Sequence, residues 1–190
     1  PRLFKNRITC FFSSSVFSLC GYPPVPDPVP FSRCLFFFLL SLSLSFLCPT
    51  MRGLYTLLPP EAEKKCSDLI ARYKNLTIKT VHSRKRTLGN YRQCADGEHL
   101  ITINDNLSPY TTLVVLIHEI AHLETRLRYG KSVPAHGKEW KQTYTILLKS
   151  FIYSNIFPKS IAENIMLHAM KPRATMSKEF IGILNSCNTD

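Results

Sequence analysis

The stretch Leu116-Ile-His-Glu-Ile-Ala-His-Leu123 decides how this chain folds, because it places His118, Glu119 and His122 in a His-Glu-x-x-His pattern. In a helix, residues i and i+4 share one face, so both imidazoles can reach one metal ion. Glu119 then lies beside a water bound to that metal. The pattern is typical of zinc hydrolases, although three fixed residue types at this spacing also arise by chance.

The residues before the motif favour a helix. Ser108-Pro109 has the form of an N-cap followed by a proline at the first helical position, where a missing N–H costs nothing. Val114 and Val115 argue for a strand instead, but the cap and the length of the segment favour the helix. Apolar residues also recur at spacings of three and four, which predicts a stripe facing a core: Leu113, Leu116, Ile117, Ile120 and Leu123.

A catalytic zinc ion is usually held by three protein groups and a water, so the motif needs a third ligand. The segment from Lys131 to Trp140 places His136 in a loop just before another helical pattern, and we predict His136 as that ligand. Glu139 and Glu163 are the alternatives for a site with a downstream glutamate ligand, and Glu139 can also serve as an outer acceptor or a cap. The alternative without a metal is that His118 and His122 are ordinary side chains on the polar face of an amphipathic helix.

The metzincin pattern requires a glycine three residues after the second histidine and another histidine six residues after it. Thr125 and Arg128 stand at these positions, so this pattern is excluded.

The motif, a spacer of 13 residues and then His136-Gly-Lys-Glu-Trp140 resemble the SprT-like zinc metallopeptidase domain, which includes the Spartan proteases. Upstream, Ser83 to Tyr91 is similar to the basic segment ending in Leu-Gly that precedes the strands of this family. Downstream, Phe157-Pro158 and the stretch from His168 to Thr175 are similar to the tail of short bacterial members. The resemblance covers about residues 54–184 and is most specific at the metal ligands.

The resemblance implies an α+β, zincin-like single domain, in which a short β-sheet packs on the helix that carries the motif and further helices follow. It also implies a zinc-dependent metalloendopeptidase that acts on DNA-associated proteins, as in DNA–protein crosslink repair. Larger members append a zinc ribbon, which this chain lacks.

Periodicity along residues 51–190 agrees with this architecture. Helical patterns cover residues 61–73, 139–153, 160–170 and 177–184, and strand patterns cover residues 77–82, 90–93 and 100–103. Asp96-Gly97 predicts a turn between the last two strands. We expect residues 90–93 to form a middle strand and residues 100–103 to form a sheet edge that pairs with an extended peptide.

The ligands determine the expected mechanism. Zinc held by three neutral histidines lowers the pKa of bound water and polarises a peptide carbonyl. Glu119 is the expected general base, which takes the proton of the water and passes it to the leaving amine. An oxyanion donor is also expected, with three candidates: Tyr129, Tyr144 and His168. His82 and His99 have no spacing that indicates metal binding.

The alternative function is a non-proteolytic, DNA-associated module in which the zinc is only structural. A structural zinc site is closed and normally includes cysteine, and no cysteine lies near the three histidines in sequence. The seven cysteines include no Cys-x-x-Cys pair, and residues 51–190 retain only Cys66, Cys94 and Cys187, which suits reduced thiols in a cytoplasm. We therefore expect a catalytic zinc ion and no further cofactor.

Basic residues exceed acidic ones in this region. Residues 51–190 hold 20 Lys and Arg and 12 Asp and Glu, a balance of +8, which attracts phosphate backbones or acidic partners. Arg84-Lys85-Arg86 is the densest cluster and our candidate for DNA association, although such a cluster is often a solvated face. Arg126, Arg128 and Lys131 lie close to the motif in sequence. We expect a protein or peptide substrate, no stable partner and a monomer.

Residues 1–50 differ in composition from the rest. They contain nine of the 12 phenylalanines and seven of the 13 prolines, with no alanine and no glutamate, up to a change at Met51. The apolar run from Leu35 to Cys48 is 14 residues long, near the length of a signal-peptide core and short of the roughly 20 that span a bilayer. We interpret residues 1–50 as upstream sequence ahead of a start at Met51, with residues 51–190 as one cytoplasmic SprT-like domain. The alternatives are a signal peptide or membrane anchor, which would make the protein exported or membrane-associated, and a disordered segment.

Overall fold

The computed structural model describes residues 53–187. The expectations for residues 1–50 and for a start at Met51 concern residues outside this part. The described elements, in chain order, are α3 (Pro60–Ile70), β1 (Leu76–Val81), β2 (Gly89–Gln93), β3 (His99–Asn104), α4 (Pro109–Tyr129), α5 (Lys138–Ile152), α6 (Lys159–Met170) and α7 (Lys178–Asn185). The α+β class is confirmed. In the described part of the chain, no helix is long and apolar enough to cross a membrane.

The three strands form one sheet in the order β1-β3-β2, with β3 parallel to β1 and antiparallel to β2. Gly97, at φ 85°, closes the predicted turn between β2 and β3. Strand β3 pairs with both other strands and so takes the central position, and its Ile101 and Ile103 are fully buried. The expectation that residues 100–103 form a sheet edge is therefore wrong, and so is the middle position expected for residues 90–93. The edge beside the metal helix is β2.

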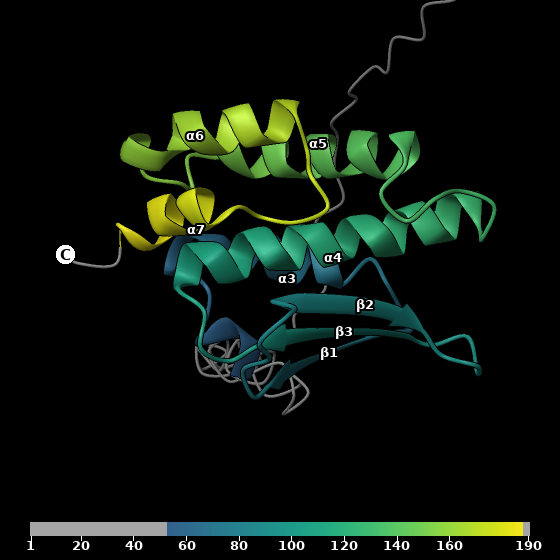
Figure 1. The fold of residues 1–190 in the computed structure, drawn as a ribbon. Coiled ribbons are helices and arrows are strands. Elements are labelled where there is room, and N and C mark those ends of the chain that lie inside the picture. Colours follow the sequence, from purple (N-terminus) through teal and green to yellow (C-terminus); the bar gives the residue numbers. More distant parts are fainter. Residues whose placement is uncertain (1–52, 188–190) are drawn as a thin grey trace, which may run out of the picture. The chain divides into compact units, whose positions relative to one another are not determined.

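Helix α4 lies between the sheet and α5, as Figure 1 shows. Its cap is the predicted one, since the Ser108 side chain accepts a hydrogen bond from the backbone N–H of Thr111. Val114 and Val115 are buried, which explains why this stretch carries a strand-like run of β-branched residues yet forms a helix packed on two sides. The helix ends at Gly130, whose φ of 66° favours glycine.

The remaining helices follow the predicted pattern. Helix α3 ends at Ile70, three residues before the predicted end, because the chain turns there: the backbone N–H of Tyr73 bonds to the carbonyl of Ile70. Helices α5, α6 and α7 match their predicted ranges to within one residue at each end. Figure 1 shows α5 and α6 on the side of α4 opposite the sheet. The core therefore surrounds α4, and this fixes the position of the motif.

Candidate metal centre

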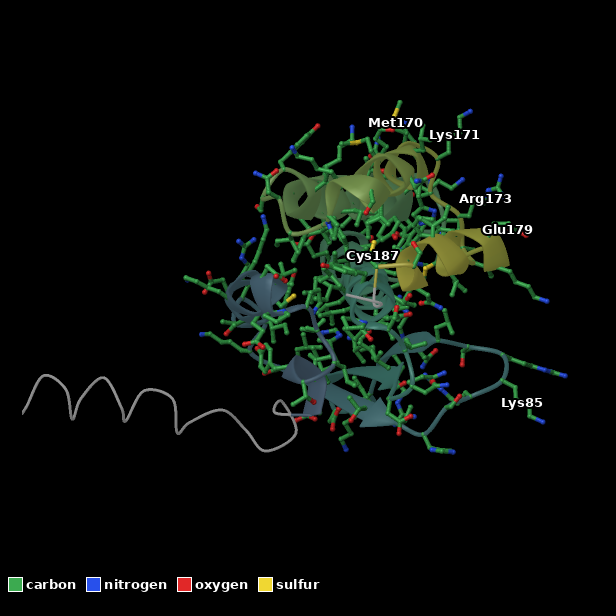
Figure 2. The ribbon with its side chains drawn as sticks, turned by 90° about the vertical axis from the view of Figure 1, so that its left-hand side faces the viewer. Lys85, Met170, Lys171, Arg173, Glu179 and Cys187 are labelled. Atoms are coloured by element: carbon green, nitrogen blue, oxygen red, sulfur yellow. The ribbon has the colours of Figure 1, made fainter. Side chains whose placement is uncertain are left out.

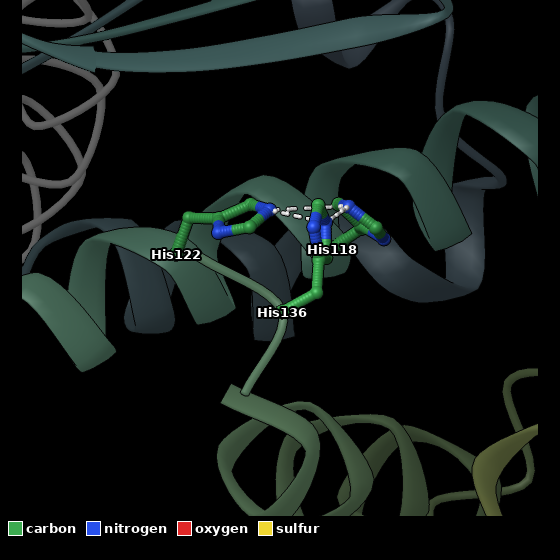
Figure 3. A group of neighbouring side chains, drawn as sticks. All are labelled: His118, His122 and His136. Atoms are coloured by element: carbon green, nitrogen blue, oxygen red, sulfur yellow. Dashed lines mark hydrogen bonds between the residues drawn. The ribbon is translucent and has the colours of Figure 1, made fainter. Parts of the chain in front are cut away.

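The three predicted ligands converge on one point. His118 and His122 project from successive turns of α4, and His136 approaches them from the loop that leads into α5 (Figure 3). Their Nε2 atoms form a triangle with sides of 3.2 Å between His118 and His122, 3.0 Å between His122 and His136, and 3.3 Å between His136 and His118. The three histidines can hold a metal ion.

The triangle has the size that a small tetrahedral cation requires. Ligand nitrogens about 2.0–2.1 Å from a tetrahedral ion lie about 3.3 Å from one another. A neutral imidazole has one N–H and one acceptor nitrogen, so three Nε2 atoms cannot all satisfy one another by hydrogen bonds. A cation at the centre satisfies all three lone pairs at once. The donor set therefore fits a metal ion that accepts three imidazoles.

The electrostatics keep the ligands neutral. Burial, followed by the charges of the neighbouring imidazoles, lowers the pKa of His118 to about 3. Burial and then His136 lower the pKa of His122 to about 4, and burial also lowers the pKa of His136. Metal binding needs deprotonated imidazoles, so at neutral pH no proton competes with the ion for these nitrogens.

Trp140 packs against all three ligands. It lies in the first turn of α5 and is fully buried, with its ring centroid 4.7 Å from that of His118, 5.2 Å from that of His122 and 4.6 Å from that of His136. Because one rigid ring touches three imidazoles, it restricts their rotation. Trp140 ends the sequence segment His136-Gly-Lys-Glu-Trp140, but its contact with all three ligands depends on how α5 packs against α4.

Glu119 of α4 lies against strand β2, at Gly89 and Tyr91. Only 6% of its surface is exposed, and its carboxylate accepts a hydrogen bond from the backbone N–H of Tyr91. Burial raises the pKa of Glu119 to about 8, against the lowering effects of that hydrogen bond and of the charge on Arg84. A cation at the three histidines adds a further lowering effect, because it stabilises the carboxylate form.

The centre opens into a cleft of about 1230 Å³. It is lined by β2 with its flanking residues 86–95, by residues of α4, by residues 130, 131 and 133–136 of the following loop, and by residues 174–176. Both His118 and Glu119 line this cleft, so a molecule in it reaches the metal position and the carboxylate together. Tyr91 of β2 also lines it, with its ring stacked at 5.9 Å on His99 and 6.4 Å on His122.

The predicted oxyanion donors do not line the cleft. Tyr129 is at the exposed end of α4, whereas Tyr144 is fully buried and its hydroxyl lies 3.2 Å from Nε2 of His168. The alternative glutamate ligands, Glu139 on α5 and Glu163 on α6, are outside the group of three histidines.

The two histidines without an assigned role, His82 and His99, do not belong to the group of metal-binding side chains. His82 is exposed and lies 3.9 Å from Asp105, and the Nδ1 atom of buried His99 bonds to the Tyr91 hydroxyl. Among the described residues, the three predicted ligands are the one group of at least three histidine, cysteine or acidic side chains with metal-binding spacing. Sequence reasoning did not assign a role to Gly89, Tyr91 or Arg126, all of which line the cleft.

Comparisons with protein-family models, with curated proteins and with solved structures gave no match to this chain. The assignment of a function therefore rests on the site.

Proposed function

We propose that residues 51–190 form a zinc-dependent metalloendopeptidase of the SprT-like, zincin-like kind. The observation that carries this proposal is the convergence of three imidazole nitrogens beside a buried carboxylate that lines an open cleft. Three neutral histidines with an open fourth position are the donor set of a catalytic zinc ion. A structural zinc site uses four protein ligands, and among the described residues no cysteine or acidic side chain joins the three histidines.

Each residue of the site has a separate role in the proposed reaction. Zinc, when bound to the three histidines, would act as a Lewis acid toward the peptide carbonyl and lower the pKa of water. Glu119 accepts the proton of the attacking water and delivers it to the leaving amine nitrogen. The Tyr91 backbone N–H orients the carboxylate for this transfer. The outer edge of β2 pairs with no strand in the described residues, so its backbone groups other than the Tyr91 N–H, which donates to Glu119, can bind an extended peptide.

The decisive experiment compares the zinc-loaded protein with the Glu119→Gln variant on a denatured protein substrate. We expect the variant to keep its zinc and to lose at least about 100-fold in kcat, since general acid–base catalysis contributes on the order of 100- to 10,000-fold. Full cleavage by the variant contradicts the proposal. Zinc binding without any cleavage by the unaltered protein supports the alternative, a non-proteolytic zinc module.

Action on DNA-associated proteins belongs to the same proposal. Lys85 and Arg86 are exposed, and Figure 2 shows Lys85 on a loop far from Lys171 and Arg173. Arg84 is partly buried and donates to Asn104 Oδ1 and Thr102 Oγ1, so this member of the cluster supports the sheet. Of the three residues of this cluster, we propose Lys85 and Arg86 for DNA association. Anisotropy of labelled DNA tests it: neutralising both residues is expected to weaken binding and its salt dependence.

A further inference from the structure

The charges that line the cleft are mostly of one sign. Apart from Glu119, the lining contains no acidic residue, and it contains four basic ones: Arg86, Arg92, Arg126 and Lys131. Among the described residues, Lys64 forms an ion pair with Asp68, and His82 lies 3.9 Å from Asp105; neither contact involves a residue of this lining. The cleft therefore presents cations that no carboxylate of the described chain neutralises.

Of these four cations, Arg126 is the one that lies on α4, the helix that carries the ligands His118 and His122. It follows His122 by four residues, so it lies one turn further along the face of α4 that carries both ligands. Arg126 is partly buried. Burial raises the pKa of Tyr91, and the charge of Arg126 lowers it. Burial lowers the pKa of His99, and the charge of Arg126 lowers it further. The guanidinium thus lies close to the Tyr91–His99 pair.

Arg92 of β2 also lines the cleft, but the alternation of side chains along the strand distinguishes it from Arg126 of α4. Gly89 and Tyr91 face α4, since Gly89 approaches Val115 and the Tyr91 ring stacks on His122. Successive side chains of a strand alternate, so Arg92 points to the other face of the sheet. Arg86 and Lys131 are exposed. Arg126 is thus the partly buried cation of this lining, and no acidic side chain of the described residues pairs with it, although its guanidinium hydrogen-bonds to the Tyr91 side chain.

The course of β2 sets the position of Arg126 relative to a bound peptide. Gly89 lies against Glu119 and Tyr91 lies against His122, so the strand and α4 advance in the same direction. One further helical turn, about 5.4 Å, brings Arg126 toward the end of β2 at Gln93. An extended peptide rises about 3.3 Å per residue, so Arg126 comes within about two residues of the position opposite the metal ligands.

We infer that Arg126 forms a subsite for an acidic side chain, and that the substrate is an extended peptide carrying Asp or Glu within about two residues of the cleaved bond. This inference rests on the proposed peptidase function. A substrate carboxylate supplies the counter-charge that the guanidinium lacks, and a hydrogen bond between two charged groups in a partly dehydrated cleft is among the stronger polar contacts. A lysine at the same position meets like charge and loses its hydration without compensation.

The test uses peptides that differ only in Glu, Gln or Lys at one position within three residues of the cleaved bond. We expect one position at which Glu exceeds Gln by about 10- to 100-fold in kcat/KM, the range for a hydrogen bond to a charged group. In Arg126→Gln this ratio is expected to fall below about threefold, and in Arg126→Glu the preference is expected to shift to Lys. Arg128→Gln is the matched control, since Arg128 is exposed on the same helix and does not line the cleft.

Binding of the same peptides to the zinc-loaded Glu119→Gln variant separates this inference from the proposed function. If the unaltered protein cleaves nothing, the peptidase proposal fails, but a Glu-over-Gln preference in Kd that Arg126→Gln removes still supports the subsite. Cleavage or binding with no preference for an acidic residue overturns the inference. So does a preference that survives Arg126→Gln, or one that Arg128→Gln removes equally.

Discussion

Gly89 of β2 lies directly against Glu119 of α4: a Cβ atom added to this glycine would be 2.7 Å from Oε1 of Glu119 and 2.5 Å from Cγ1 of Val115. Both distances are shorter than real Cβ contacts. The strand reaches the helix because residue 89 has no side chain, and this approach brings the Tyr91 N–H to the Glu119 carboxylate.

Gly89→Ala is expected to displace the Glu119 carboxylate and lower kcat by about 10-fold or more, because a shift of the order of 1 Å in a catalytic group can cost about 100-fold. Zinc content should stay unchanged, since the three histidines are untouched. Gly182→Ala is the control, as an added Cβ there meets nothing within 4 Å. Equal activity of Gly89→Ala and the control would show that the contact does not position Glu119.

Trp140→Ala is expected to weaken zinc binding and to destabilise the fold by about 3–5 kcal/mol, the usual range for removal of a buried aromatic ring. Trp140→Phe keeps a ring among the imidazoles and should recover part of the affinity. Competition with a chelator measures the zinc affinity, and chemical unfolding of the metal-free protein measures the stability. If Trp140→Ala lowers stability but leaves zinc affinity unchanged, the ring has no part in ordering the ligands.

His136→Ala is expected to abolish stoichiometric zinc binding at neutral pH, because two helix histidines leave the ion with too few protein ligands. Glu139→Gln changes a glutamate three residues away that is outside the histidine group, and should retain one zinc per chain. Metal analysis after dialysis gives both values. The opposite pattern, zinc retained in His136→Ala and lost in Glu139→Gln, would move the third ligand to Glu139.

Stability of the metal-free protein should decrease as the pH falls from about 6.5 toward 4. The folded pKa values of His118 and His122 are about 3 and about 4, so in this window the unfolded chain binds protons that the folded one does not. Each such group contributes up to about 1.4 kcal/mol per pH unit to the slope of the unfolding free energy. Urea unfolding across this range, with chelator present, measures it; a flat profile contradicts the prediction.

Glu119 changes the stability of the metal-free protein with pH in the direction opposite to that of the histidines. Its folded pKa of about 8 lies above that of an ordinary glutamate, so the folded protein holds a proton that the unfolded chain has released, and its contribution to stability is lost as the pH rises from about 4.5 to 8. Glu119→Gln removes this loss. The stability difference between the metal-free variant and the unaltered protein should therefore increase with pH across this window. A constant difference would indicate that Glu119 is ionised throughout.

The helix of the metal motif was predictable because every signal for it is local. The Ser108 cap, the apolar spacing along α4 and the i,i+4 relation of the two ligands all act within a few turns. The same holds for the turn at Gly97. Strand order was not predictable in this way: β3 is central because both β1 and β2 pair with it, and this pairing joins segments that are distant in sequence.

Residues 108–129 thus carried enough local information to specify a capped helix and the two imidazoles on one face of it, since helical geometry alone relates residues four apart. His136 could be named from sequence as the missing ligand. The distance of 3.0 Å between its Nε2 atom and that of His122, however, depends on the course of the loop before α5 and on the packing of Trp140 against both rings. The contacts of Gly89 with Glu119, and the place of Arg126 in the cleft, join residues from different elements. Such contacts arise only when the sheet packs on α4, because burial of apolar surface, which is not directional, brings together segments distant in sequence.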